Sequence, residues 1–164
     1  MNVQVPTRPV QPDDEDRFVR LWPRLSPETV YRRFHSPIRR LTPSEVHRLV
    51  TVDHDLREAV VAVVGGEVVG VARYDRSPSS PATAELAIVV EDDWQGVGLG
   101  RQLLTEIIER ARRHGVTTLV ATVQEDNERM LWLLRQLLPG ARLHSDLGTY
   151  EVTAPVPAAF GLSA

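Results

Sequence analysis

The pattern of polar and apolar positions in the first 50 residues predicts three helices. An acidic run at residues 13–16 precedes an apolar stretch, and carboxylates favour a helix N-terminus because they face the positive end of its dipole. Ser26-Pro27 predicts the start of a second helix, with serine as N-cap and proline in the first turn. Thr42 and Glu45 have the spacing of a capping box, which predicts a third helix ending near Val50.

From residue 59 onward the pattern changes to β-branched runs that predict strands. Residues 59–64 and 68–74 are apolar runs on either side of Gly65-Gly66, and two strands around a Gly-Gly turn form a β-hairpin. A loop rich in serine and proline follows at residues 76–82, and residues 84–90 predict a third strand.

The second half of the chain alternates between helices and strands. Residues 99–114 carry apolar positions at helical spacing and end at a glycine suited to a left-handed cap. Residues 117–123 predict a strand, and residues 128–138 predict a helix that a Pro-Gly pair stops. Residues 141–156 predict a last strand or hairpin, and we expect residues 156–164 to be a frayed tail.

This order of elements predicts one mixed α/β domain over residues 1–164. The chain is long enough to bury a core without disulfide bonds or bound metals to stabilise it. Its 42% hydrophobic and 25% charged residues are typical of a soluble globular protein. The sequence contains no cysteine, which excludes disulfide bonds, thiolate metal ligands and a cysteine nucleophile. We expect no metal site.

The charge of the chain limits its partners. A net charge of -3 gives no electrostatic basis for nucleic-acid binding, and all 19 basic residues are arginine, so the chain has no lysine side chain to be modified. No apolar run reaches the length of a membrane span, so we expect no membrane partner. Residues 1–4 lack the basic region and apolar stretch of a signal peptide, so we expect a cytoplasmic location.

Three glycines at alternate positions, Gly96, Gly98 and Gly100, join the third predicted strand to the long helix. A helix N-terminus offers unpaired N–H groups, and glycines let a phosphate approach the backbone, so this loop suits a pyrophosphate. A P-loop requires a lysine that the chain lacks, and the dinucleotide fingerprint has a different glycine spacing. A tight turn that binds no ligand is the alternative.

The segment Gln95-x-x-Gly98-x-Gly100 resembles the coenzyme A pyrophosphate signature of the GNAT superfamily of N-acetyltransferases. The resemblance extends upstream to residues 84–90 and downstream to residues 127–131. It implies a mostly antiparallel sheet flanked by helices, with acetyl-CoA as co-substrate and no metal. The implied coenzyme-binding loop consists of Gln95, Gly96, Val97, Gly98, Leu99, Gly100 and Arg101.

A narrower resemblance covers the N-terminal part of the chain. Residues 25–28, 31–34, 41–45 and 52–53 are similar in order and spacing to the acetyltransferase domain of bacterial protein lysine acetyltransferases. It implies a protein lysine as acceptor and an acyl-CoA synthetase as partner. A small amine as acceptor and a non-catalytic acyl-CoA sensor remain as alternatives. Neither the oligomeric state nor the acyl-chain preference follows from the sequence.

Glu85 is the candidate general base, because it is a lone carboxylate in an apolar strand next to the glycine loop. Strand alternation places it on one face with Ala87 and Val89, and we expect it to be partly buried, which makes a carboxylate a stronger base. The lysine acetyltransferases that the chain resembles have their catalytic glutamate at this position. An exposed sheet-edge glutamate is the alternative, with Asp53 or Glu125 as competing carboxylates.

The resemblance also implies roles for three residues along the coenzyme arm. Backbone groups of Ile88 and Val90 are expected to pair with the pantetheine arm, and an N–H near Val90 to polarise the thioester carbonyl. Asn127 is expected to bond the same arm, to cap the following helix, or both. Many small-molecule enzymes of the superfamily carry a tyrosine acid where this chain has Leu134. We interpret four arginines as a solvated helix surface, with a basic face toward an acidic partner protein as the alternative: Arg32, Arg33, Arg39 and Arg40.

Overall fold

The computed structural model describes residues 3–38 and 40–158. Its strands are β1 (Thr7–Pro9), β2 (Arg57–Val64), β3 (Glu67–Ser77), β4 (Ser80–Val90), β5 (Thr118–Gln124), β6 (Arg142–Asp146) and β7 (Thr149–Pro155). Its α-helices are α1 (Glu15–Leu21), α2 (Pro27–Phe34), α3 (Pro43–Val50), α4 (Leu99–Arg113) and α5 (Glu128–Leu137), with short 3-10 turns at Pro12–Asp14, Trp22–Arg24 and Asp92–Trp94. Among the helices of this described part, none is long and apolar enough to cross a membrane.

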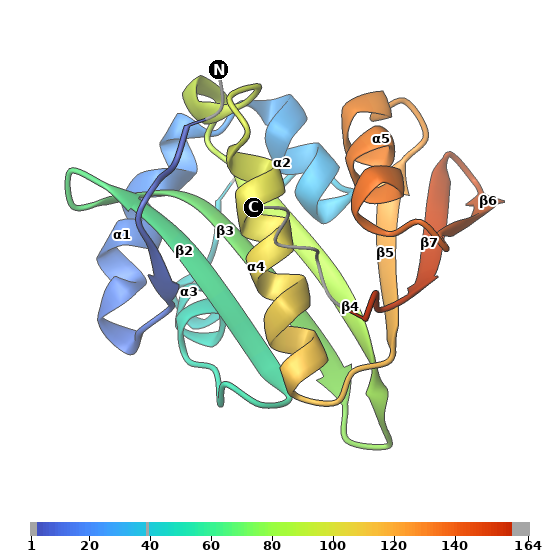
Figure 1. Ribbon diagram of the computed structural model, residues 1–164. Coiled ribbons are helices and arrows are strands. Elements are labelled where there is room, and N and C mark those ends of the chain that lie inside the picture. The colour runs from blue at the N-terminus through green and yellow to red at the C-terminus, as the bar shows by residue number, and fades with distance from the viewer. Residues whose placement is uncertain (1–2, 39, 159–164) are drawn as a thin grey trace.

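The strands form one seven-stranded sheet in the order β1-β2-β3-β4-β5-β7-β6. Neighbouring strands are antiparallel apart from β4 and β5, which run parallel. Helix α4 crosses one face of the sheet, while α1 and α3 pack on the opposite face (Figure 1). The predicted mixed, mostly antiparallel sheet flanked by helices is therefore confirmed.

Local sequence signals place the predicted turns and helix starts. Gly65 and Gly66 have positive φ angles of 58° and 78°, which the tight turn between β2 and β3 requires and which glycine adopts freely. The Ser26 side chain accepts a hydrogen bond from Thr29 N–H, so it is the N-cap of α2. Thr42 forms its capping box at the start of α3, as predicted.

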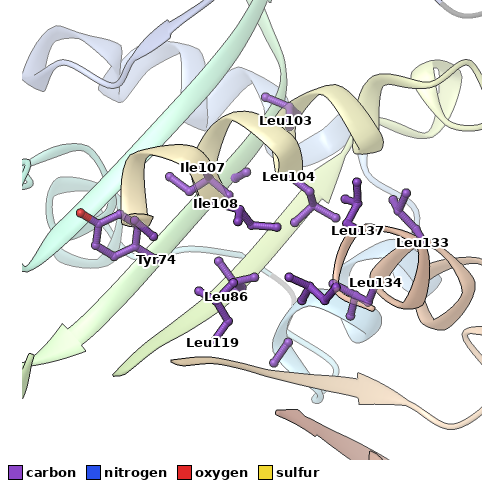
Figure 2. Close-up of a cluster of buried hydrophobic side chains, with 14 of the residues drawn as sticks. Tyr74, Leu86, Leu103, Leu104, Ile107, Ile108, Leu119, Leu133, Leu134 and Leu137 are labelled. Atoms are coloured by element: carbon purple, nitrogen blue, oxygen red, sulfur yellow. The ribbon is translucent and has the colours of Figure 1, made fainter. Parts of the chain in front are cut away.

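The larger of two apolar cores lies between the sheet and the helices α4 and α5. One face of α4 presents apolar side chains to Tyr74, Leu86 and Leu119 of the sheet (Figure 2). The buried α4 side chains are Leu99, Leu103, Leu104, Ile107, Ile108 and Ala111. The second core joins α1 and α3 to the opposite face of the sheet. The sheet is thus covered on both faces, which fixes β4 between two packed layers.

Strands β4 and β5 pair over a short stretch only. Residues 83–85 of β4 pair with residues 118–120 of β5. Beyond them β4 continues along β3 to Val90, and β5 continues along β7 to Gln124. The two strands therefore separate toward their C-terminal ends, in the middle of the sheet.

Two differences from the sequence prediction lie near the ends of the chain. The short strand β1 pairs with β2 and was not predicted. Val156, assigned to a frayed tail, donates its N–H to Thr117 O at 2.9 Å and packs against the main core. Val156 therefore belongs to the packed domain, and residues 159–164 of the predicted tail lie outside the described residues.

Replacing Leu103 by alanine should destabilise the fold through loss of packing on α4. Leu103 is fully buried, and its Cδ1 atom lies 2.8 Å from where a Cβ on Gly70 would stand, so the two residues fit together closely. We expect Leu103→Ala to lower the free energy of unfolding by about 2–5 kcal/mol in urea titrations. The control Val19→Ala, on an exposed face of α1, should change it by less than about 0.5 kcal/mol. Equal losses in both variants would contradict this account of the core.

Candidate active site

A cleft of about 690 Å³ opens where β4 and β5 separate. Its walls come from α2, the C-terminal half of β4 (residues 85–90), the loop before α4, β5 and α5. Its volume lies in the range of small-molecule and cofactor sites. All the predicted site residues apart from Val97 and Leu99 line this cleft.

The backbone of β4 is turned toward the cleft at Ile88 and Val90. Glu91 donates its N–H to Val69 O at 2.9 Å, so these opposed residues form a hydrogen-bonded pair between β3 and β4. In an antiparallel ladder such pairs alternate with pairs that do not exchange hydrogen bonds. The N–H and C=O groups of Ile88 and Val90 therefore point away from β3, toward the open gap. A ligand with its own amide groups can pair with this strand edge.

The glycine loop forms an anion cradle at the start of α4. Gly96 and Gly98 have φ angles of 77° and 91°, a region that glycine adopts without strain. The N–H of Gln102 is bonded to Gly98 O, so it closes the first turn of the helix. The preceding helical N–H groups, of Leu99, Gly100 and Arg101, have no acceptor within the helix. They and the helix dipole favour a phosphate at this point.

Two arginines add positive charge beside this cradle. Arg129 Nη1 lies 3.8 Å from the position of a Cβ on Gly96, and the Arg101 guanidinium lies 5.7 Å from the centre of the Trp132 ring. Guanidinium groups bind phosphate by charge-assisted hydrogen bonds. The sequence analysis missed Arg129. Arg129 puts a positive charge in the first turn of α5, where the helix dipole disfavours it. This unfavourable position was the sequence signal that could have identified Arg129 as a site residue.

Side chains of the loop before α4 hold it against α2. Asp92 Oδ1 accepts a hydrogen bond from Ser26 N–H at 2.9 Å. Gln95 Nε2 donates to Thr29 Oγ1 at 3.1 Å and to Val90 O at 2.9 Å. Burial raises the pKa of Asp92, but the hydrogen bonds from Ser26 and Thr29 outweigh it and keep that pKa below its ordinary value. Asp92 is therefore an ionised side chain that helps to hold this loop against α2.

Glu85 lies in the cleft on the face of the sheet that also carries Val89, as strand alternation predicted. The expected partial burial is wrong, since the side chain is exposed. Glu85 is the last β4 residue that pairs with β5, so its side chain lies where the strands begin to separate and the cleft opens to solvent. Asp75 lies directly opposite Glu85 on β3. In the described part of the chain, Glu85 makes no hydrogen bond or ion pair with another side chain.

The end of α2 supplies three cleft residues that the sequence analysis did not assign to the site: Arg32, Arg33 and His35. All three are half-buried, so the interpretation as a solvated surface is wrong for Arg32 and Arg33. Arg40 is exposed, and Arg39 lies outside the described residues. Gln124 Nε2 lies 2.6 Å from His35 Nδ1, which joins α2 to β5. Burial, reinforced by the charge of Arg33, lowers the pKa of His35, so its imidazole is neutral at neutral pH.

Asn127 is the N-cap of α5, because its Oδ1 accepts from Met130 N–H at 3.3 Å. The same oxygen lies 3.5 Å from Arg32 Nη1. Asn127 lines the cleft, and its contact with a coenzyme arm stays a prediction. The side chains of Val97 and Leu99 pack into the core, so only their backbone groups are available to a ligand.

The competing carboxylates lie outside the cleft lining. Asp53 accepts hydrogen bonds from the N–H groups of Asp55 and Arg57, and Glu125 accepts from Ser145 Oγ. Glu91 is buried and forms an ion pair with Arg24 at 3.0 Å. Within residues 3–38 and 40–158, no group of His, Cys, Asp and Glu side chains could hold a metal ion.

The geometry defines a class of protein. A diphosphate cradle at one end and a free strand edge along the cleft fit coenzyme A, whose diphosphate is followed by an arm containing two amides. An exposed carboxylate lies farther along the same strand, where a second substrate can enter from solvent. This arrangement fits an acyl-CoA-dependent transferase.

Comparisons with known proteins agree with this class. The profile of the Acetyltransferase (GNAT) family matches residues 16–137, and the chain belongs to this family. Solved proteins that share the fold include complexes with acetyl-CoA. The crystal structure of the GNAT domain of S. lividans PAT superposes with a TM-score of 0.83 at 30% identity, covering 91% of this chain and 89% of that chain.

Two curated relatives differ in how much of this chain they match. The Acetyltransferase Pat of Mycolicibacterium smegmatis is 34% identical over 152 residues, which are 92% of this chain and 45% of that protein. An L-methionine sulfoximine/L-methionine sulfone acetyltransferase of Pseudomonas aeruginosa is 41% identical over 81 residues, 48% of this chain and 47% of that protein. The chain thus spans about half the length of these two relatives.

Replacing Gly100 by valine should weaken coenzyme A binding while the fold survives. A Cβ on Gly100 would make only an ordinary contact with Leu133 Cδ2, at 3.6 Å, so the protein itself leaves space for it. The added side chain would stand where the phosphate approaches the cradle. We expect calorimetry to show more than tenfold weaker binding, about 1.4 kcal/mol or more. Unchanged affinity in a variant with normal thermal unfolding would refute the cradle assignment.

Proposed function

We propose that this protein transfers an acetyl group from acetyl-CoA to the side chain of a lysine on another protein. The observation that carries the proposal is the position of Glu85 in the same cleft as the anion cradle and the free edge of β4. Both substrates can then be held together for direct attack, without a covalent enzyme intermediate.

The donor is held by backbone groups. The N–H groups at the start of α4 bind the diphosphate, and the edge of β4 at Ile88 and Val90 pairs with the pantetheine arm. The arm runs from the cradle past Val90 to Ile88, so this pairing carries the thioester along β4 toward Glu85. A backbone N–H of this edge near Val90 then stabilises the negative charge that grows on the carbonyl oxygen during attack.

Glu85 removes the proton from the acceptor. A lysine ammonium has a pKa of about 10.4 and must become neutral before it attacks. Because Glu85 is exposed, it takes that proton either directly or through a water molecule in the cleft. The coenzyme leaves as a thiolate or takes its proton from water. Leu134 has no proton to give, and no tyrosine of the described residues lines the cleft.

Support for a protein acceptor comes from the N-terminal helices. The similarity to Acetyltransferase Pat covers 92% of the chain, whereas that to the methionine sulfoximine enzyme covers 48%. Residues 25–28 and 31–34, which resemble bacterial protein lysine acetyltransferases, form or flank α2, and α2 lines the cleft that also contains Glu85. By that resemblance we propose an acyl-CoA synthetase as the partner.

Replacing Glu85 by glutamine tests the base. Glutamine keeps the shape of the side chain but cannot accept the proton, so kcat should fall by roughly 10²–10⁴-fold while coenzyme A affinity stays nearly unchanged. Glu125→Gln is the matched control. That carboxylate lies outside the cleft lining, so the variant should retain activity. Full activity in Glu85→Gln would move the base to another group or to water. A joint loss of coenzyme binding would indicate a structural role.

Competition between acceptors tests the substrate class. An acyl-CoA synthetase should be acetylated with a higher kcat/KM than free lysine, spermine or an aminoglycoside, measured by coenzyme A release and by mass spectrometry of the products. If a small amine has the higher kcat/KM, the small-molecule function replaces the proposed one. If acetyl-CoA binds without turnover on any of these amines, the chain is an acyl-CoA sensor.

A further inference from the structure

Two opposite charges in the cleft lack a partner. Arg33, at the end of α2, lines the cleft beside Glu85 of β4. Burial lowers the pKa of Arg33 and the negative charge of Glu85 opposes that shift, yet no ion pair forms between the two side chains. Across residues 3–38 and 40–158, Arg33 makes no hydrogen bond or ion pair, although it stacks on the Phe34 ring at 4.6 Å. A half-buried guanidinium without an acceptor is unfavourable unless something else supplies one.

The other nearby carboxylates already have partners. Asp75, opposite Glu85, is held by Arg57 at 3.0 Å. Glu28, one turn before Arg32, is held by Arg32 at 2.8 Å. Neither forms an ion pair with Arg33, and only the through-space charges of Asp75 and Glu85 oppose the cost of burying it. If Glu85 receives the ammonium of an acceptor, Arg33 loses the support of that carboxylate.

A second buried cation increases the excess of positive charge. Arg73 is only 4% exposed and donates to Leu49 O at 2.7 Å. Burial and the charge of Arg33 lower the pKa of Arg73 to about 10, so it still carries its charge at neutral pH. Arg33 and Arg73 both line a small apolar pocket beside the cleft. The acceptor side of the site thus attracts an anion next to the base.

We propose that Arg33 binds a carboxylate of the acceptor, next to the amine that Glu85 deprotonates. The proposal rests on the proposed function and narrows its substrate class to amines that carry a neighbouring acidic group. On a protein, that group is the side chain of an aspartate or glutamate close to the target lysine. On a small molecule, it is the α-carboxylate of an amino acid. A guanidinium suits both, because it binds carboxylates through two parallel hydrogen bonds.

Pairs of acceptors test this proposal. We would compare otherwise identical lysine peptides with glutamate or glutamine beside the lysine, and L-methionine with its amide, at saturating acetyl-CoA. The parent protein should prefer the acidic member by at least tenfold in kcat/KM, mainly through KM. Arg33→Gln should bring that ratio to within twofold of one, and Arg33→Lys should restore part of it. The control Arg135→Gln, on the exposed side of α5, should keep the parent ratio.

The outcomes separate this proposal from the proposed function. A parent ratio near one, or a ratio that Arg33→Gln leaves intact, overturns the role of Arg33 while peptide acetylation upholds the lysine acceptor. A preference for free amino acids over their amides that depends on Arg33, without peptide acetylation, supports Arg33 and overturns the protein acceptor. Transfer to neither class overturns both. The parent ratio does not depend on whether any variant folds.

Discussion

The interaction on which this site depends is the short parallel pairing between β4 and β5. Hydrogen bonds join residues 83–85 to residues 118–120, and past that point each strand keeps only its outer neighbour. A sheet opened in its middle leaves backbone donors and acceptors that need partners. One of them, the carbonyl of Val90, is bonded to the side chain of Gln95, and the rest of that edge faces a cleft suited to an amide-containing ligand. The opening thus leaves one edge of β4 without a strand partner and forms the cleft.

Helix α2 braces the opening by contacting both of its sides. At its first turn, Ser26 and Thr29 bond to the loop that follows β4. Near its C-terminal end, Arg32 reaches Asn127 at the start of α5, and His35 reaches Gln124 on β5. His35 adopts a left-handed backbone conformation, with a φ of 58°, that a residue without glycine's freedom rarely takes. The bond to Gln124 helps to hold this residue in place. The same helix that shapes the acceptor side therefore keeps the strands at a fixed separation.

The sequence was sufficient for the parts of the structure that local chemistry determines. Caps at Ser26, Thr42 and Asn127, the Gly65-Gly66 turn and the strand alternation around Glu85 follow from residue type and spacing. The three-residue strand β1 could not be predicted, because a segment that short carries too little pattern. The exposure of Glu85 could not be predicted from the sequence either. Alternation tells which face a side chain occupies but not whether a cleft opens beside it on that face.

The two halves of the site differ in how much of their chemistry the sequence reveals. The donor half consists largely of backbone groups, whose placement requires glycines at fixed positions, so a short motif is enough to reveal it. The acceptor half consists of side chains from α2, β3 and β4 whose charges matter only in combination. Arg32 and Arg33 are adjacent in sequence, yet Arg32 is neutralised by Glu28 while Arg33 has no such partner among the described residues. Only the fold distinguishes them, and that difference is what gives the acceptor side its charge. The proposed acceptor therefore follows from charges that only the folded chain leaves unpaired.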